Sequence, residues 1–500
     1  MAKLNDPAPD PMAPPDTFQA VLKVAFEVHN AGRHAEAEAL CRVLLDRHAH
    51  DPQLRFLLGM VLHRLGRDRE ALEHLTRAAE LPAPAARVFN ALGLVQHALG
   101  EEARAVASYE LALALGPPSA DTFYSLGNAC YNLGEVERAI SCFQQAVALH
   151  PRDAASWNNL AKCLKDCNRL EEALAAYDQS LAADPDYPLA RYGRTIVLLT
   201  AGRLPEGFYE YNQWRNQQRV KPREFPRPAW RGEPVPGRTL FLHAEQGFGD
   251  ALQDVRFIPL ARARAGAAKV ILECRPELKT LFVHSSCADV VIAYGETIPA
   301  FDCWTSLISL PGLLDMTAPT IPGHTPYLQA PHGPPLPAAP AGHRKVGLVW
   351  AGNPAHHNDA ARSLRLAELA PLLQVPGVTF YSLQRPVPAR DEAAFRSTPN
   401  LVDLGGRLDD FLATAAVVAQ LDLVIAVDTA VAHLAGALGK PTWTLLPFSP
   451  DWRWFLDQPD TPWYPTMRLC RQPQRGQWPP VLRQVAADLA GFTPPPEGAF

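Results

Sequence analysis

Three polar residues come shortly after an apolar pattern typical of a strand. This is a position at which proteins bind phosphate. In the segment LDLVIAVDTAVAHLAGALGKPTWTLLP, Asp428 and Thr429 stand between an apolar run and a helical pattern rich in alanine and glycine, and His433 lies one helical turn after Thr429. A helix that begins at the end of a parallel strand offers free backbone N–H groups and the positive end of its dipole. This junction is therefore predicted to bind a diphosphate without a lysine. The alternative for His433 is a buried histidine whose hydrogen bonds are satisfied.

A carboxylate in a similar setting is the candidate base. The apolar run TLFLH is followed by a turn that contains Gly247, Gly249 and Asp250, and then by a helical pattern. Glycines let a substrate approach the backbone closely, and a carboxylate placed there is able to accept a proton from an attacking hydroxyl. The alternative is that Asp250 only caps the helix, since the helix dipole favours a carboxylate at that position.

Two further polar positions follow predicted strands. The strand KVGLVW opens into a loop with Asn353, Asn358 and Arg362, and Gln384 comes directly after the strand TFYSL. Arg362 is a candidate for a bidentate phosphate contact that Asn358 or Ser363 helps to orient. Gln384 is a candidate for a contact to a nucleotide's ribose or base. The alternative for the loop is a solvated segment that caps the next helix.

Two regions of alternating strands and helices would position these residues, at 238–330 and 344–490. A proline-rich connector at 220–237 precedes the first region, and another at 331–343 separates the two. The pattern predicts two lobes with parallel sheets and a cleft between them. The closing run PVLRQVAADLA is expected to be a helix that crosses back over the first lobe. The expected strands are 239–243, 269–273, 290–293, 346–350, 379–383, 423–427 and 442–446.

Residues 17–219 carry a 34-residue period. Its small, flexible positions are Gly32, Gly66, Gly100, Gly134, Asn168 and Gly202. Other small residues mark a helix crossing, at Gly59, Gly93, Gly127 and Ala161, and bulky ones fill the groove beside it, at Cys41, Leu75, Tyr109, Phe143, Tyr177 and Tyr211. This register resembles the tetratricopeptide repeat in about six copies. The last copy departs from the pattern with Thr195 and Gly207, as expected of a terminal repeat that packs against the next domain.

The bulk composition excludes several classes of protein. The net charge of −5 provides no basic field for a nucleic acid. The nine cysteines form no CxxC pair or Cys/His cluster, so no metal site is expected. No run of about eighteen apolar residues predicts a membrane span, and residues 1–16 lack the pattern of a signal peptide. A cytoplasmic protein is expected, with a disordered N-terminal tail at 1–16 and a second tail at 491–500.

The two lobes resemble the GT-B glycosyltransferase fold, and most closely the bacterial heptosyltransferase family. Gly249-Asp250 before a helix is similar to that family's GD motif, whose aspartate is the base. VDTAVAHLAGALGKP is similar to its donor-binding segment, which implies diphosphate contacts from Asp428, Thr429, Ala430, Val431 and His433. Ala430 stands where the family has glycine. The family's phosphate-binding lysine has no counterpart here unless Arg362 or Lys440 serves.

The resemblance implies an inverting, metal-independent glycosyltransferase that uses a nucleotide-sugar donor and no other cofactor. The order of repeats and GT-B lobes is also similar to that of the O-linked N-acetylglucosamine transferases, which modify proteins. A protein or peptide acceptor presented by the concave surface of the repeats is therefore the expected partner. Two alternatives stay open: a non-catalytic scaffold or nucleotide-sugar sensor, and a transferase that acts on a lipid-linked glycan.

Overall fold

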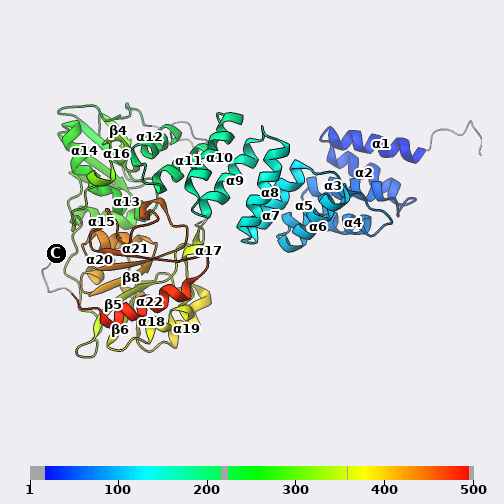
Figure 1. Cartoon of the computed structure of the whole chain (residues 1–500). Helices are drawn as coiled ribbons and strands as arrows, with labels where there is room; N and C mark the ends of the chain where they lie inside the picture. The colour runs from blue at the N-terminus through cyan, green and yellow to red at the C-terminus, as the bar shows by residue number, and fades with distance from the viewer. Residues whose placement is uncertain (1–16, 216–222, 224, 357, 495–500) are drawn as a thin grey trace, which may run out of the picture. The chain divides into compact units, whose positions relative to one another are not determined.

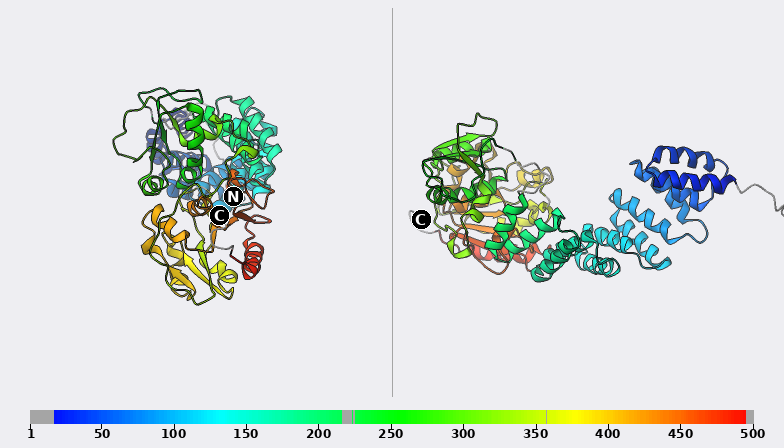
Figure 2. Two further views of the ribbon diagram at one scale, coloured as in Figure 1. Left: turned by 90° about the vertical axis from the view of Figure 1, so that its left-hand side faces the viewer. Right: turned by 90° about the horizontal axis from the view of Figure 1, so that it is seen from above.

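The computed structural model describes residues 17–215, 223, 225–356 and 358–494. The expected tail at 1–16, four residues of the first connector and the end of the second tail lie outside this part of the chain. The chain folds as two compact units, Met1–Ala190 and Arg191–Phe500. The first unit is helical, and the second contains both parallel sheets (Figures 1 and 2).

Antiparallel helix pairs build the first unit, as the 34-residue period predicts. Their turns carry the flexible residues at positive φ, from 74° to 82° at the glycines and 59° at Asn168. That conformation costs glycine little and other residues more. The helices are α1 (Thr17–Asn30), α2 (His34–Leu45), α3 (Pro52–Arg64), α4 (Asp68–Ala79), α5 (Ala86–Ala98), α6 (Glu102–Leu115), α7 (Ala120–Asn132), α8 (Val136–Leu149), α9 (Ala154–Asp166) and α10 (Leu170–Ala183).

The small and bulky positions of the repeat meet inside each pair. A Cβ added to Gly93 in α5 would lie 2.6 Å from the ring of Tyr109 in α6. The same addition at Gly127 would lie 2.8 Å from the Phe143 ring. The predicted pairing of small and bulky residues is therefore confirmed, and it allows the two helices of a pair to approach closely.

Replacing Gly93 with valine should destabilise the first unit. The added side chain must displace the fully buried Tyr109 ring, which we expect to lower the free energy of unfolding by about 1–3 kcal/mol. Urea denaturation followed by circular dichroism measures this loss. Ala98→Val, at an exposed position of the same helix, is the matched control, and equal stability of the two variants would contradict the packing argument.

The sixth helix pair consists of α11 (Pro188–Thr200) and α12 (Leu204–Arg215), and nearly all of it belongs to the second unit. Asn212 donates from Nδ2 to the carbonyl of Ser309 at 3.4 Å. The Phe208 ring lies 5.6 Å from the Trp452 ring, edge to face. This pair packs against the α/β region, which agrees with its departures from the repeat pattern.

The first lobe of the second unit has a four-stranded parallel sheet in the order β3-β2-β1-β4. The expected single helix after β1 is interrupted, because a 3₁₀ turn at Val255–Phe257 separates two shorter helices. The strands are β1 (Thr239–His243), β2 (Lys269–Cys274), β3 (Val290–Ala293) and β4 (Cys303–Ser306). The helices are α13 (Phe248–Asp254), α14 (Ile258–Ala265), α15 (Pro276–His284) and α16 (Leu310–Leu313).

The second lobe has a six-stranded parallel sheet in the order β10-β9-β8-β5-β6-β7. The chain order reverses between β5 and β8, and ligands of such sheets bind beyond the carboxyl ends of the strands at this point. The strands are β5 (Arg344–Val349), β6 (Val378–Ser382), β7 (Leu401–Asp403), β8 (Leu423–Val427), β9 (Thr442–Leu446) and β10 (Met467–Arg471). The helices are α17 (Asp359–Arg362), α18 (Ala370–Leu373), α19 (Glu392–Arg396), α20 (Phe411–Val418), α21 (Ala430–Ala437) and α22 (Trp478–Gly491).

The prediction for the closing helix was wrong. α22 packs on the second lobe, beside α18 and β10, and not on the first lobe (Figure 1). Its apolar face carries Trp478, Leu482 and Val485, which share a core with strands of the second sheet. The amphipathic pattern identified the helix, but it carried no information about which lobe covers its apolar face.

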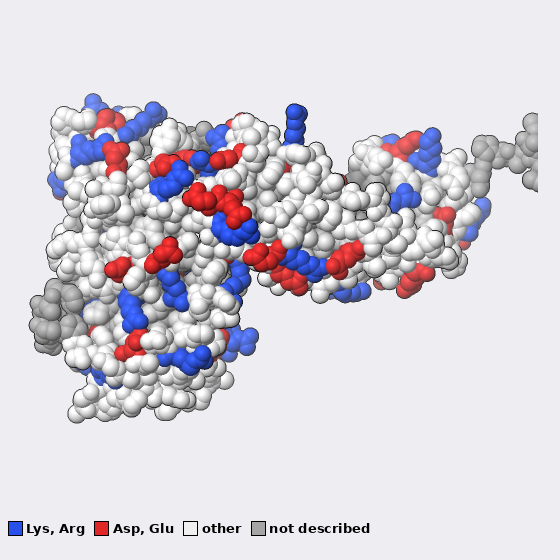
Figure 3. Space-filling model, viewed as in Figure 1, with Lys and Arg blue, Asp and Glu red and all other residues white. Residues whose placement is uncertain are grey.

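Basic and acidic side chains are interspersed on the face that Figure 3 shows, in each unit taken by itself. Among the residues that the structure describes, no helix is long and apolar enough to cross a membrane.

Candidate functional site

The two candidate junctions lie against each other in the second unit. α13 begins just after the first strand of its lobe, and it packs against α21, which begins just after β8. A Cβ added to Gly249 would lie 2.8 Å from the His433 ring. Gly249 is therefore required for the close approach of the two lobes, and the candidate base lies next to the candidate diphosphate site.

Both carboxylate oxygens of Asp250 accept hydrogen bonds. Gly247 donates its backbone N–H to Oδ2 at 2.8 Å, so Asp250 caps α13 as the alternative interpretation expects. Arg453 donates from Nη2 to Oδ1 at 2.5 Å. A quarter of the Asp250 side chain stays exposed. Its use as a base stays a prediction, and it requires that Arg453 release one oxygen.

Arg453 is a site residue that the sequence did not reveal. It lies in a 3₁₀ turn at Trp452–Trp454, after β9, and is 7% exposed. Its guanidinium pairs with Asp250 of the other lobe and, at 2.9 Å, with Asp451. Burial opposes the charge, but Asp451, Asp250 and Asp254 raise the pKa of Arg453. Arg453 stands alone among aromatic residues such as Trp452 and Trp454, and the sequence gives it no strand or helix start that would mark it.

Asp254 is a second carboxylate that sequence reasoning missed. It lies one turn after Asp250 on α13 and is 2% exposed. Burial raises its pKa to about 7, with a further contribution from Asp250, against the opposing charges of Arg453 and Arg256. In the described part of the chain, no donor hydrogen-bonds its carboxylate. The carboxyl is therefore part-protonated near neutral pH.

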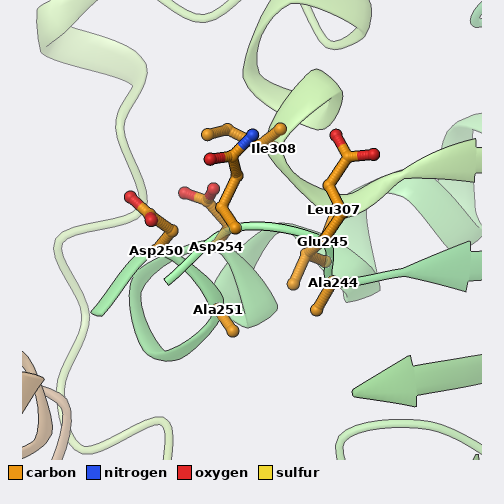
Figure 4. Close-up of a pocket in the computed structure, with 8 residues that line it drawn as sticks. Ala244, Glu245, Asp250, Ala251, Asp254, Leu307 and Ile308 are labelled. Atoms are coloured by element: carbon orange, nitrogen blue, oxygen red, sulfur yellow. The ribbon is translucent and has the colours of Figure 1, made fainter. Parts of the chain in front are cut away.

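Asp250 and Asp254 line one small cavity with Glu245 and Leu307 (Figure 4). Its volume is about 10 Å³, close to the space that a single water requires. The cavity lies between the segments that follow β1 and β4, where the strand order of the first sheet reverses. The first lobe thus places Asp250 at the position where such sheets bind ligands.

The donor-side junction has a free helix start. Thr429 is the N-cap of α21, and the N–H groups of Ala430 and Val431 have no acceptor among the described residues. Arg362 donates from Nη1 to the backbone carbonyl of Asp428 at 2.9 Å. Burial and the charge of Asp451 raise the pKa of Asp428 to about 6, while Arg362 opposes the shift. The predicted grouping of Arg362 with this junction is present in the structure.

His433 is buried and is neutral at physiological pH. Burial and the nearby Arg453 charge lower its pKa to about 3. Its Nδ1 lies 2.8 Å from the Tyr464 hydroxyl, and its ring stacks on Trp454 at 5.1 Å. Nε2 lies 3.9 Å from Oδ1 of Asp428. Nδ1 of His433 is thus engaged by Tyr464, and Nε2 faces the junction at Asp428.

Gln384, Asn353 and Asn358 make their hydrogen bonds, or lie, within the loops of the second lobe. Gln384 accepts from the N–H groups of Trp350 and Ala351 at 3.2 Å and 3.0 Å, so its amide joins two loops. Asn353 is exposed and bonds the backbone of its own turn, and Asn358 precedes α17. Donor contacts from these three residues stay predictions.

Lys440 is not near the junction. Its ammonium donates to the carbonyl of Leu421 at 2.8 Å, and these residues precede β9 and β8. They therefore lie at the amino edge of the sheet, away from the carboxyl edge where α21 begins. Within the described ranges, no group of three or more His, Cys, Asp or Glu is arranged to bind a metal ion.

Two parts of the chain match known protein families. Residues 29–84, 56–120, 124–188 and 165–219 match the tetratricopeptide repeat. Residues 367–477, within the second lobe, match glycosyltransferase family 9 (heptosyltransferase). The chain therefore joins tetratricopeptide repeats to a family 9 region. The first lobe, with Asp250, lies outside both matches.

A curated relative matches a large part of the chain. The protein FlbA of Caulobacter vibrioides (strain ATCC 19089 / CIP 103742 / CB 15) is 29% identical over 343 residues, which are 61% of this chain and 56% of FlbA. The match thus spans little more than half of that relative.

Solved structures resemble part of the chain at low overall similarity. YrrB, described as a TPR protein with an unusual peptide-binding site, is 22% identical with a TM-score of 0.34, covering 36% of this chain and 93% of YrrB. PilF of Pseudomonas aeruginosa is 17% identical with a TM-score of 0.35, covering 40% and 97%.

Proposed function

We propose that this chain, which joins tetratricopeptide repeats to a family 9 region, transfers a sugar from a nucleotide-sugar donor to an acceptor hydroxyl. The observation that supports this most is the contact between the two junctions. Gly249 and His433 touch, which brings a carboxylate of one lobe to the free helix start of the other. A base beside a diphosphate site is what this transfer requires.

The reaction would run with inversion at the anomeric carbon. Asp250 takes the proton of the acceptor hydroxyl, while the oxygen of that hydroxyl forms a bond to the anomeric carbon. The bond from that carbon to the diphosphate oxygen breaks, and the electron pair leaves with the nucleoside diphosphate. The N–H groups of Ala430 and Val431 and the guanidinium of Arg362 stabilise the charge on the leaving group. Positive charge from these protein groups would take the place of a metal ion.

The acceptor would be a protein or peptide bound by the repeats. Stacked helix pairs form an extended concave surface, and such surfaces commonly bind peptide segments. The sixth pair, α11 and α12, packs against the lobe that carries Asp250. The repeats and the transferase lobes are thus parts of one chain.

Turnover of a panel of nucleotide sugars tests the proposal. The full chain should release a nucleoside diphosphate from one member of the panel, and release should accelerate when the acceptor is present. Mass spectrometry of proteins that co-purify with the chain, searched for glycosyl mass shifts, reports the acceptor and the sugar together. If the chain releases no nucleoside diphosphate from any donor, even with proteins from the source cell added, the proposal is wrong.

A nucleotide-sugar sensor without turnover is the second candidate, and one observation favours it. Asp250 is engaged by Arg453, and the cavity beside it is about 10 Å³. A protein that binds donors in calorimetric titration but releases no product with any acceptor would be a sensor. Binding followed by transfer decides for the enzyme.

A further inference from the structure

The feature that the proposed reaction leaves unexplained is the buried guanidinium between the two junctions. We propose that Arg453 is a ligand of the donor diphosphate, and that donor binding draws it away from Asp250 so that the base becomes free only when the donor is present. This inference rests on the proposed function and adds an order of events to it. It concerns the ion pair of Arg453 with Asp250 across the two lobes.

Arg453 lies where a donor phosphate would arrive. Its turn follows β9, the neighbour of β8 in the sheet, so it shares the carboxyl edge with the start of α21. The next residue, Trp454, stacks on His433. The Arg453 charge also acts on the protonation of His433 and of Asp428. Its guanidinium therefore belongs to the electrostatic surroundings of the predicted diphosphate site.

The guanidinium also has unused capacity to donate. Its Nε is buried and has no acceptor among the described residues. Arg362, the other arginine of this site, uses Nη1 to hold the carbonyl of Asp428, and Lys440 lies at the opposite edge of the sheet. A diphosphate offers several oxygens in the planar, two-point arrangement that an arginine recognises best. Arg453 is thus the best-placed cation to receive it.

Arg453 can exchange Asp250 for a phosphate and keep a counter-ion throughout. Arg453 would replace one anion, the carboxylate of Asp250, with another, a phosphate oxygen, and it would keep Asp451 two residues away on its own turn. Asp250 is a quarter exposed, so water can solvate the released oxygen. The second oxygen stays fixed by the N–H of Gly247, which keeps the carboxylate oriented for its acceptor. Arg453 never needs to be buried without a counter-ion.

The ion pair makes Asp250 a competitor of the diphosphate for Arg453. Removing the charge of Asp250 should therefore tighten the binding of a nucleoside diphosphate, although it removes the base. Asparagine keeps the shape and can still accept from Gly247. For Asp250→Asn we expect about tenfold tighter binding, which corresponds to one charge-assisted hydrogen bond. A base without this link to Arg453 would show no such gain.

Calorimetric titration of the full chain with ADP, GDP, UDP and CDP measures this effect. Glu245→Gln is the matched control, since Glu245 lines the same cavity as Asp250 and makes no bond to Arg453. We expect less than a twofold change for the control. In an Arg453→Gln background, which has no cation for Asp250 to compete for, Asp250→Asn should no longer tighten binding. Circular dichroism of each variant reports its folding, and the Asp250→Asn comparison stands even if Arg453→Gln fails to fold.

Each result has one meaning. Tighter binding for Asp250→Asn, absent in the Arg453→Gln background, supports the exchange. Equal affinity of wild type and Asp250→Asn, or an equal gain for Glu245→Gln, overturns it and leaves the proposed function standing. If no nucleoside diphosphate binds wild type or Asp250→Asn while the chain is folded, both the exchange and the proposed function are wrong.

Discussion

Asp250→Asn should reduce sugar transfer by about 10²–10⁴-fold in kcat at saturating donor. The amide cannot accept the proton of the attacking hydroxyl, whereas it preserves the cap of α13 because its oxygen still accepts from the N–H of Gly247. The fold should therefore persist while the reaction is lost. Product formation measured by mass spectrometry, with the acceptor that the wild-type chain modifies, gives the ratio directly.

The neighbouring carboxylates serve as controls for this loss. Glu245 lines the same cavity, but the structure gives it no bond to Gly247 or Arg453. We expect Glu245→Gln to retain transfer within a few-fold of wild type. If Asp250→Asn transfers sugar as fast as wild type, Asp250 is not the base. If Asp254→Asn instead shows the large loss, the base lies one turn further along α13.

The repeats were the most predictable part of the fold, because each position in the period has one physical requirement. Gly100 must adopt positive φ, and Gly93 must leave room for Tyr109. Such requirements are local to a helix pair, so the sequence states them directly. The strands 239–243, 290–293, 423–427 and 442–446 were also predicted to the residue, since long apolar runs bounded by turn residues leave few alternatives.

Elements that depend on tertiary contacts were not predictable in the same way. β4, with the sequence CWTS, and β7, with LVD, are short and have no periodicity, and each is a strand because a neighbouring strand offers it backbone bonds. The position of α22 depends on which apolar surface remains uncovered. A sequence window contains neither kind of information.

The residues of the candidate site also differ in how far the local sequence reveals them. The strand–helix junctions at Asp250 and Asp428 follow from local pattern, and the structure brings Gly249 of the first to His433 of the second. Arg453 had no local signal, because a lone arginine in an aromatic run has no strand or helix start to mark it. Its importance comes from the carboxylates that the other lobe brings to it.

Asp254→Asn should stabilise the chain at pH 8 and leave its stability at pH 4 nearly unchanged. Burial raises the pKa of Asp254 from 3.8 to about 7 in the folded chain. Between these values the folded chain holds a proton that the unfolded chain has released, so the unfolding free energy falls as pH rises. Above pH 7 the fold carries the full cost of the buried charge, which is about 4 kcal/mol at about 1.4 kcal/mol per pKa unit.

Thermal unfolding of wild type and Asp254→Asn, recorded from pH 4 to pH 8, measures this cost. The difference between the two should be near zero at pH 4, should grow through the interval to pH 7, and should level off above it. Asp428, whose pKa burial also raises, contributes equally to both proteins and cancels from the difference. Asp409→Asn, at a position 80% exposed, is the control and should stay within about 0.5 kcal/mol of wild type. A pH-independent difference would mean that Asp254 is ionised throughout, held by Arg453 and Arg256, and that this turn of α13 carries no proton near neutral pH.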